Sequence, residues 1–284
     1  MPLRYAVHAY AWTSSWSNDD LWIIEHARSL GLDALEVPLM EPDKVDPAAI
    51  AERAQACGLE VLGSLALPEG ADPSHEDPEV RRRGVELLNR CIDLTADMGG
   101  TIMTGVIYAA IGRMIDRKPE ESDYVRTAET LREVALHAQS RGVTIGIEAI
   151  NRYETFLVNS AAQALRLREL VGEPNVGVHL DAYHMNIEED DFYAPTLAAV
   201  PHLVHFHLSE SHRGIPGRGT VDWEAVMRAL ADGGYAGFVG LESFVGIAEA
   251  MRAATRIWRE LAPDSDTLVR EGLAYLKGVE AAHS

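Results

Sequence analysis

Val176-Gly177-Val178-His179-Leu180-Asp181 is the stretch that decides the fold, because a short apolar run ends there in a carboxylate. Side chains alternate between the two faces of a strand, so Asp181, His179 and Gly177 share one face and the three aliphatic residues share the other. Further runs in the second half of the chain also have one small or polar face and one apolar face. These runs are Thr144–Glu148, Leu203–His207 and Phe238–Glu242.

The spacing of these runs predicts a (β/α)8 barrel. Their apolar faces suit strands covered by helices, and their ends at residues 148, 181, 207 and 242 lie 33, 26 and 35 residues apart, the length of a strand-helix-strand unit. The chain of 284 residues also matches one such barrel, which typically has about 250 residues. We therefore expect an α/β barrel forming a single domain over residues 1–284, with an extra C-terminal helix at 264–281.

The remaining strands and helices are predicted from apolar patterns, capping residues and Gly or Pro positions. The expected strands are 5–10, 34–38, 59–67 and 101–107, and the expected helices are 19–30, 47–57, 79–98, 121–141, 160–171, 222–233 and 246–261. The segments 151–154 and 183–189 are expected to be polar loops that follow the fifth and sixth strands.

Composition limits the classes of protein that fit. The chain is 47% hydrophobic and has no apolar run of membrane-spanning length, so a soluble protein with a large core is expected. Its formal charge of -19 disfavours nucleic acid as a partner, because a polyphosphate backbone would be repelled. Cys57 and Cys91 are the only cysteines, and the N-terminus lacks a signal-peptide pattern, so we expect a cytoplasmic protein without disulfides.

The strand ends carry residue types that bind metal ions. Active sites of (β/α)8 barrels lie where the strands end, so Glu148, Asp181, His207 and Glu242 are expected to converge. Three carboxylates and one imidazole form an oxygen-rich site for a divalent cation. Without a cation, the neighbouring carboxylates would repel one another and raise each other's pKa.

Other inward-facing residues are expected to lie near this site. Glu36 ends the second strand within reach of the same rim, and His179 and His205 lie one layer deeper as buried polar support. Alternation places Val204 and Phe206 on the outer face of their strand.

The loops above the strands carry aromatic residues with two possible roles. Trp12 and Trp16 lie on the loop after the first strand, where loop packing and a hydrophobic wall for a substrate are both open. Residues 108–111, beginning with Tyr108, are expected to overhang the site. The glycine-rich segment 214–219 lacks the Lys and Ser/Thr of a phosphate loop, so it is interpreted as a turn that covers the substrate.

Four motifs at the strand ends resemble the ketose 3-epimerases, which act on D-tagatose, D-allulose and L-ribulose and belong to the xylose-isomerase-like barrels. The motifs are EAINRYE at 148–154, LDAYHMNIEE at 180–189, HFHLSESHR at 205–213 and LESF at 241–244. The resemblance implies epimerisation of free ketoses at carbon 3 by two-base proton exchange through an enediolate. It also implies a Mn²⁺ cofactor, with Mg²⁺ or Co²⁺ as possible substitutes, and a homodimer or homotetramer.

The resemblance also implies roles for individual residues. Glu148, Asp181, His207 and Glu242 would bind the metal, and Glu148 and Glu242 would exchange the proton. The other expected substrate contacts are Glu154, His184 and Arg213, around the first and second sugar oxygens, together with His8, Trp12 and Tyr108. The first strand and Ile111 depart from the family pattern at the far end of the sugar site, so the preferred ketose is not predicted.

Other functions are compatible with the same barrel. An aldose-ketose isomerase of the hydroxypyruvate isomerase type needs the same metal and bases but places the first and second carbons between them. A lyase similar to inosose dehydratase is a further enzymatic alternative. A sugar-binding barrel without catalytic activity would have lost one of the two proton-exchanging carboxylates, whereas Glu148 and Glu242 are both present here.

Overall fold

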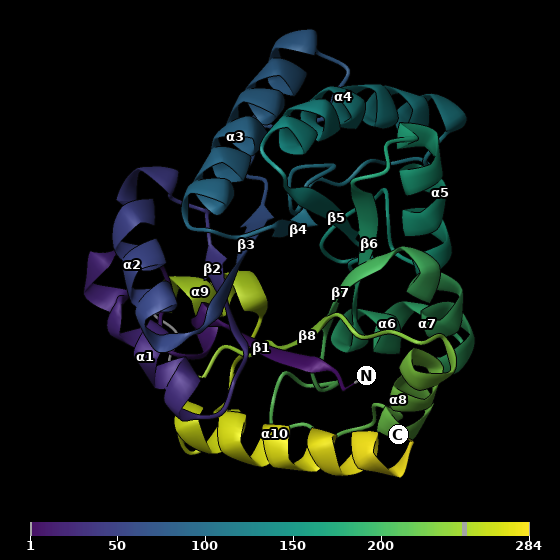
Figure 1. Cartoon of the computed structure of the whole chain (residues 1–284). Coiled ribbons are helices and arrows are strands. Elements are labelled where there is room, and N and C mark those ends of the chain that lie inside the picture. Colours follow the sequence, from purple (N-terminus) through teal and green to yellow (C-terminus); the bar gives the residue numbers. More distant parts are fainter. Residues whose placement is uncertain (1, 246–248, 284) are drawn as a thin grey trace.

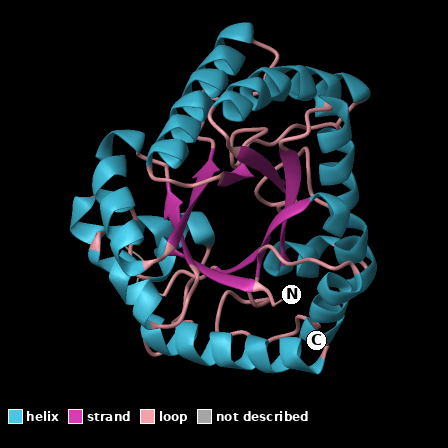
Figure 2. Ribbon diagram, viewed as in Figure 1, coloured by secondary structure: helices cyan, strands magenta, loops and turns pink. Residues whose placement is uncertain are grey.

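The computed structural model describes residues 2–245 and 249–283 and contains a closed barrel of eight parallel strands inside a layer of helices (Figures 1 and 2). The strands follow one another around the barrel in chain order, and β8 pairs with β1 to close it. They are β1 (Arg4–His8), β2 (Ala34–Pro38), β3 (Glu60–Ala66), β4 (Ile102–Val106), β5 (Thr144–Glu148), β6 (Val176–Asp181), β7 (Leu203–His207) and β8 (Phe238–Leu241). The predicted fold class is confirmed.

The helices lie mostly where the sequence predicts them, because several begin at a capping Asp or Ser that accepts a backbone N–H. These caps are Asp46, Asp77, Ser160, Asp222 and Asp264. The α-helices are α1 (Trp22–Ser29), α2 (Pro47–Cys57), α3 (Pro78–Asp97), α4 (Glu121–Ser140), α5 (Ala161–Val171), α6 (Ala182–Glu188), α7 (Tyr193–Ala199), α8 (Trp223–Asp232), α9 (Glu249–Thr255) and α10 (Ser265–Ala282). Short 3₁₀ turns are η1 (Ala9–Ala11), η2 (Asn18–Asp20), η3 (Pro42–Lys44) and η4 (Val200–His202). None of the described helices combines the length and apolar character needed to cross a membrane.

Three local predictions are corrected by the structure. The first strand ends at His8 rather than residue 10, because the chain turns into η1 and the Tyr10 N–H bonds to His8 Nδ1. The segment 183–189, predicted as a loop, is mostly the helix α6, and α7 was not predicted; each has seven residues, too few for a clear periodic pattern. The helix predicted from residue 246 begins in a segment outside the described residues, and α9 ends before Arg256, which has a left-handed φ of 58°.

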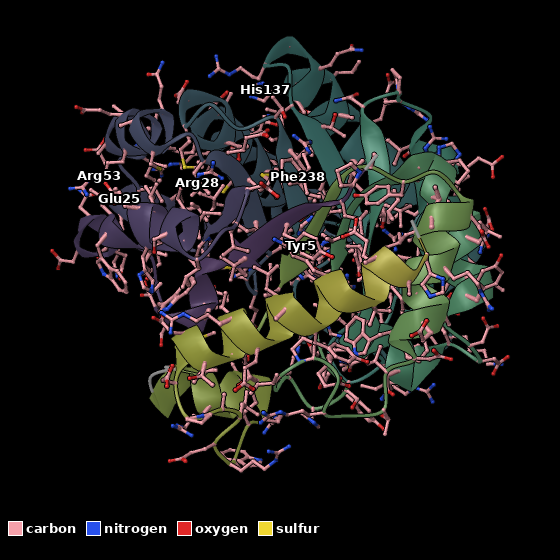
Figure 3. The ribbon with its side chains drawn as sticks, turned by 60° about the horizontal axis from the view of Figure 1, so that its bottom comes forward. Tyr5, Glu25, Arg28, Arg53, His137 and Phe238 are labelled. Atoms are coloured by element: carbon pink, nitrogen blue, oxygen red, sulfur yellow. The ribbon has the colours of Figure 1, made fainter. Side chains whose placement is uncertain are left out.

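The C-terminal helix completes the ring of helices around the barrel. In Figure 1, α10 runs between α1 and α8, and His26 on α1 bonds to Asp266 at 2.7 Å. Tyr5 points from β1 toward α10 (Figure 3) and donates a hydrogen bond to Glu280 at 2.9 Å. The helix expected as an addition beyond the eight units therefore takes the eighth place in the ring, whereas α9 contributes to the pocket described below.

The inside of the barrel is filled in layers. Its lower layer is apolar and consists of Ala6, Ala34, Leu62 and Phe238. The Arg4 guanidinium stacks on the Phe238 ring at 3.7 Å and covers this end of the barrel. The buried carboxylates and imidazoles described below lie in the layers nearer the carboxyl ends of the strands.

Glycines on β5, β6 and β8 leave room for bulky neighbours. A Cβ on Gly240 would lie 2.9 Å from His205 Nε2. The outward position predicted for Val204 is wrong, because the pairing of β6 with β7 shifts register there and inserts one extra residue. Val204 turns into the barrel, where a Cβ on Gly146 or Gly177 would lie 2.7 or 2.3 Å from its methyl groups.

Candidate active site

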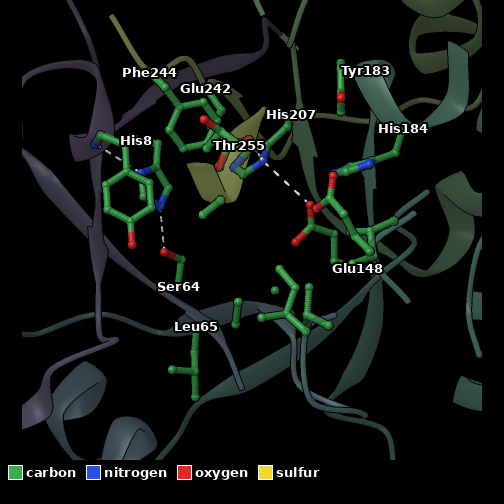
Figure 4. A pocket seen from close by; sticks show the side chains of 18 of the residues that line it. His8, Ser64, Leu65, Glu148, Tyr183, His184, His207, Glu242, Phe244 and Thr255 are labelled. Atoms are coloured by element: carbon green, nitrogen blue, oxygen red, sulfur yellow. Dashed lines mark hydrogen bonds and ion pairs between the residues drawn. The ribbon is translucent and has the colours of Figure 1, made fainter. Parts of the chain in front are cut away.

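A pocket of about 220 Å³ lies at the carboxyl ends of the strands (Figure 4). Glu148, His207 and Glu242 line it, and Asp181 is fully buried against the same cluster. His207 Nδ1 lies 3.6 Å from Glu242 Oε2, 3.9 Å from Asp181 Oδ2 and 4.0 Å from Glu148 Oε1. Ligand atoms of Glu148, Asp181 and His207 all lie within 4.8 Å of one another, close enough to hold a single cation, and Glu242 adds a further carboxylate beside His207.

The buried carboxylate of Glu36 determines which nitrogen of His207 faces this point. Glu36 Oε2 lies 2.7 Å from His207 Nε2 and 3.2 Å from His205 Nε2. An ionised carboxylate only accepts hydrogen bonds, so both Nε2 atoms carry the proton. His207 Nδ1 is therefore the nitrogen that faces the three carboxylates, and it has no hydrogen-bond partner among the described residues. A carboxylate that holds one nitrogen while the other faces the ion is the usual arrangement of histidine ligands.

The charges of the cluster also favour a cation. Burial lowers the pKa of His207, but the carboxylates of Glu36 and Glu242 more than offset this effect and raise it to about 10. Burial raises the pKa of Glu148 well above its usual range. It acts in the same direction on Glu242, but Arg213 and His207 lower that pKa overall. A cation at Nδ1 would take the place of the proton there and supply positive charge to the buried Glu148, so the residues fit a divalent cation.

Arg213 reaches the cluster from the loop after β7. Its backbone has a left-handed φ of 61°, and its carbonyl accepts a hydrogen bond from the Ser243 hydroxyl at 2.6 Å. The guanidinium donates to Asp181 at 2.8 Å and also to Glu242, and it lies over the Tyr183 ring at 4.0 Å. The strained backbone therefore aims a fixed cation at two carboxylates of the site.

Asn151 fixes His184 on the neighbouring wall. The backbone N–H and the side-chain amide of Asn151 lie 3.0 and 2.8 Å from His184 Nδ1, so this nitrogen accepts and Nε2 carries the proton. Burial lowers the pKa of His184 to about 3, which keeps the imidazole neutral. The same amide donates to Glu154 Oε1 at 2.7 Å. Glu154, His184 and Arg213 all line the pocket.

Two predicted substrate contacts do not reach the pocket. The Trp12 indole instead donates to Asp266 at 3.0 Å, and Trp16 is buried in the hydrophobic core. Tyr108 is fully buried and donates to the carbonyl of Val158 at 3.1 Å. These aromatic residues serve loop packing. Of the other residues considered at the far end of the site, His8 and Ile111 do line the pocket.

Other residues of the site were not predicted from the sequence. They include Tyr10, Ser64 and Phe244 in the pocket wall, and Met251, Ala254 and Thr255 from the segment of α9. Strand alternation could have indicated Ser64, which shares the inward phase of β3 with Leu62. No sequence pattern indicates that α9 turns back over the pocket. His179 lies beneath it; its two ring nitrogens have no hydrogen-bond partner among the described residues, and Nδ1 lies 3.8 Å from Glu148 Oε2.

Comparisons with known proteins identify the family. The profile of the xylose isomerase-like TIM barrels matches residues 24–278. A ketose 3-epimerase from Arthrobacter globiformis is 35% identical over 288 residues, which cover 98% of this chain and 99% of that protein. An L-ribulose 3-epimerase from Mesorhizobium japonicum is 36% identical over 283 residues, which cover 98% of this chain and 95% of that protein. The chain belongs to the ketose 3-epimerases.

Solved structures of ketose 3-epimerases have the same fold. An L-ribulose 3-epimerase structure superposes with a TM-score of 0.94 at 35% identity, covering 99% of this chain and 96% of that one. A D-allulose 3-epimerase from Methylomonas sp., in complex with D-allulose, gives a TM-score of 0.92 at 33% identity, with coverages of 97% and 96%. The resemblance identified in the sequence and the isomerase class of the enzyme are confirmed.

The role of Glu36 predicts a measurable loss of metal affinity. Wild-type protein should bind about one divalent ion per chain, and Glu36→Gln should weaken Mn²⁺ binding about 10- to 100-fold, because the amide holds His207 less firmly. Calorimetric titration of chelator-treated protein measures the affinity, and elemental analysis measures the stoichiometry. Glu60→Gln is the matched control, since Glu60 lies at the amino-terminal end of β3, away from the pocket, and pairs with Arg4. Unchanged affinity in Glu36→Gln would show that Glu36 does not support the metal ligand.

Proposed function

We propose that this member of the family is a metal-dependent enzyme that epimerises free ketoses at carbon 3. The main support is that Glu148, at the end of β5, and Glu242, directly after β8, both line one pocket together with His207 (Figure 4). The substrates proposed are of the D-allulose/D-fructose, L-ribulose/L-xylulose or D-tagatose/D-sorbose type. The names of the relatives support this range, since they include L-ribulose and D-psicose 3-epimerases.

Glu148, Asp181, His207 and Glu242 would hold the cation, which we propose is Mn²⁺, with Mg²⁺ or Co²⁺ as substitutes. Their three carboxylates and one imidazole suit such ions. When bound, the cation supplies Lewis-acid stabilisation of the negative charge that develops on the sugar oxygens. Glu36 would keep His207 in the required tautomer.

Epimerisation needs a base on each face of carbon 3. One of Glu148 and Glu242 would take the proton from carbon 3, leaving an enediolate, and the other would return a proton from the opposite face. The configuration at carbon 3 is then inverted. The two carboxyl groups have then swapped protonation states, and proton exchange with the solvent restores the starting states.

The other polar residues of the pocket would place carbon 3 between these two groups. Arg213 and the Nε2–H of His184 are donors, whereas Glu154 is an acceptor. Together they would hold the first and second oxygens of the ketose. The Asn151 amide, which bonds to both His184 and Glu154, supports this role, because a prearranged site spends less binding energy on ordering its side chains.

We further propose a homodimer or homotetramer and a cytoplasmic location. The free thiols of Cys57 and Cys91 support a reducing compartment.

Replacing either proton-transfer residue should abolish turnover. Glu148→Gln and Glu242→Gln keep the size and one oxygen ligand but remove the exchangeable carboxyl group, so each should lower kcat by at least about 10²- to 10⁴-fold. His205→Asn is the comparison, since that residue touches Glu36 rather than the pocket, and it should mainly lower thermal stability. Metal content is measured in parallel to separate lost chemistry from a lost ion. Near-normal kcat in either Gln variant would remove that residue from the proposed pair.

The position of solvent hydrogen should separate an epimerase from an aldose-ketose isomerase. In deuterated water, the recovered ketose product should carry deuterium on carbon 3, because that carbon loses its proton and regains one from an exchanged carboxyl group. NMR of D-allulose or L-ribulose reaction mixtures locates the label. Deuterium on the first or second carbon, with an aldose formed at a comparable rate, would contradict the epimerase proposal and favour the isomerase.

A further inference from the structure

The pocket wall across from Arg213 and His184 is largely apolar. It is built from β1 to β4 and their loops, and its side chains include Met40, Leu65, Ala66, Val106 and Ile111. Ser64, at the carboxyl end of β3, interrupts this surface with a hydroxyl group. Its side chain lines the pocket, although the residue is only 8% exposed. A polar group at this depth requires hydrogen-bond partners.

His8 supplies one of these partners in a fixed orientation. The Tyr10 backbone N–H donates to His8 Nδ1 at 3.1 Å, so the proton of the neutral imidazole is on Nε2. His8 Nε2 lies 2.7 Å from Ser64 Oγ and therefore donates to it (Figure 4). Both nitrogens of His8 are thus engaged within the protein. His8 lines the pocket but has no free nitrogen for a substrate.

The Ser64 hydroxyl keeps its own proton. Oγ accepts from His8, and among the residues that the structure describes no acceptor is within hydrogen-bonding distance of this hydroxyl. The chain of donors runs from the Tyr10 N–H through His8 to Ser64 and ends at the pocket. Such chains polarise each successive donor. The fitting partner is an acceptor oxygen on a bound molecule.

The arrangement of the walls identifies the part of the substrate concerned. On the proposed function, Glu154, His184 and Arg213 hold the first two oxygens from the side of β5 to β7. Carbon 3 lies between Glu148 and Glu242, so the rest of the ketose extends toward β1 and β3. This inference rests on that proposed function.

We propose that Ser64 is a specificity-determining residue that donates a hydrogen bond to a ketose hydroxyl beyond carbon 3, and that His8 is the positioning residue that orients it. The apolar side chains around Ser64 cannot replace this bond. A ketose with a hydroxyl oxygen at this point is favoured over one that places a carbon there.

The proposal is tested by comparing kcat/KM of the wild-type enzyme and its variants on two ketoses. The probes are D-allulose and 1,3-dihydroxybutan-2-one, which keeps the first three carbons and their oxygens but ends in a methyl group. Deuterium incorporation at carbon 3 is followed for both, with the uncatalysed rate subtracted. Ser64→Ala should lower kcat/KM for D-allulose about tenfold, the value of one hydrogen bond, and change that of the truncated ketose less than about twofold.

Further variants separate contact from folding. Ser64→Thr retains the hydroxyl and should restore most of the activity on D-allulose. His8→Phe should show the same substrate-dependent loss as Ser64→Ala, and the double variant should lose little more, because both remove one interaction. Ser140→Ala, on the surface of α4, is the matched control and should leave both substrates unaffected.

Each outcome has a distinct meaning. An equal loss on both ketoses in Ser64→Ala, or no loss on either, would overturn the role of Ser64 while leaving the epimerase proposal intact. Additive losses in the double variant would overturn the positioning role of His8. Wild-type enzyme that labels carbon 3 of neither ketose would overturn the proposed function and this inference together.

Discussion

Glu36 accepts hydrogen bonds from both His205 and His207 in the buried interior of the barrel, and the geometry of the pocket depends on these two bonds. They turn Nδ1 of His207 toward three carboxylates, where a positive charge is favourable. Gly240 on the adjoining strand β8 makes room for the imidazoles. The packing of the barrel, the orientation of His207 and the fit of the cluster to a cation are therefore parts of one constraint.

Strand alternation makes the centre of this site predictable from the sequence. Each proposed metal ligand ends a strand on the inward phase, and parallel strands place their ends at one rim. The helix ends were also predictable, since residues such as Asp222 and Asp264 cap them locally. Chemistry carried by regular strands is visible in the sequence because its geometry repeats every two residues.

The features of the fold and the site that the sequence did not predict depend on contacts that no local pattern encodes. The extra residue in β7 turns Val204 to the opposite face of the strand, and side-chain alternation in the sequence does not reveal such an insertion. Trp12 bonds to Asp266 from the far end of the chain, so its removal from the pocket follows only from the packing of α10. The contact between His8 and Ser64 also joins distant parts of the sequence, because the two residues lie 56 positions apart on β1 and β3, the strands on either side of β2. The residues proposed to select a substrate are brought together by such long-range contacts, whereas those proposed to carry the reaction follow the strand repeat.

We propose that one divalent cation binds at the ends of four successive strands through Nδ1 of His207. Anomalous diffraction from crystals of the Mn²⁺-loaded protein tests it most directly. We expect one strong peak per chain, within about 2.5 Å of Nδ1 of His207 and of carboxylate oxygens from Glu148, Asp181 and Glu242. A peak bound instead to Nε2 of His207, with Glu36 as its carboxylate ligand, would contradict it.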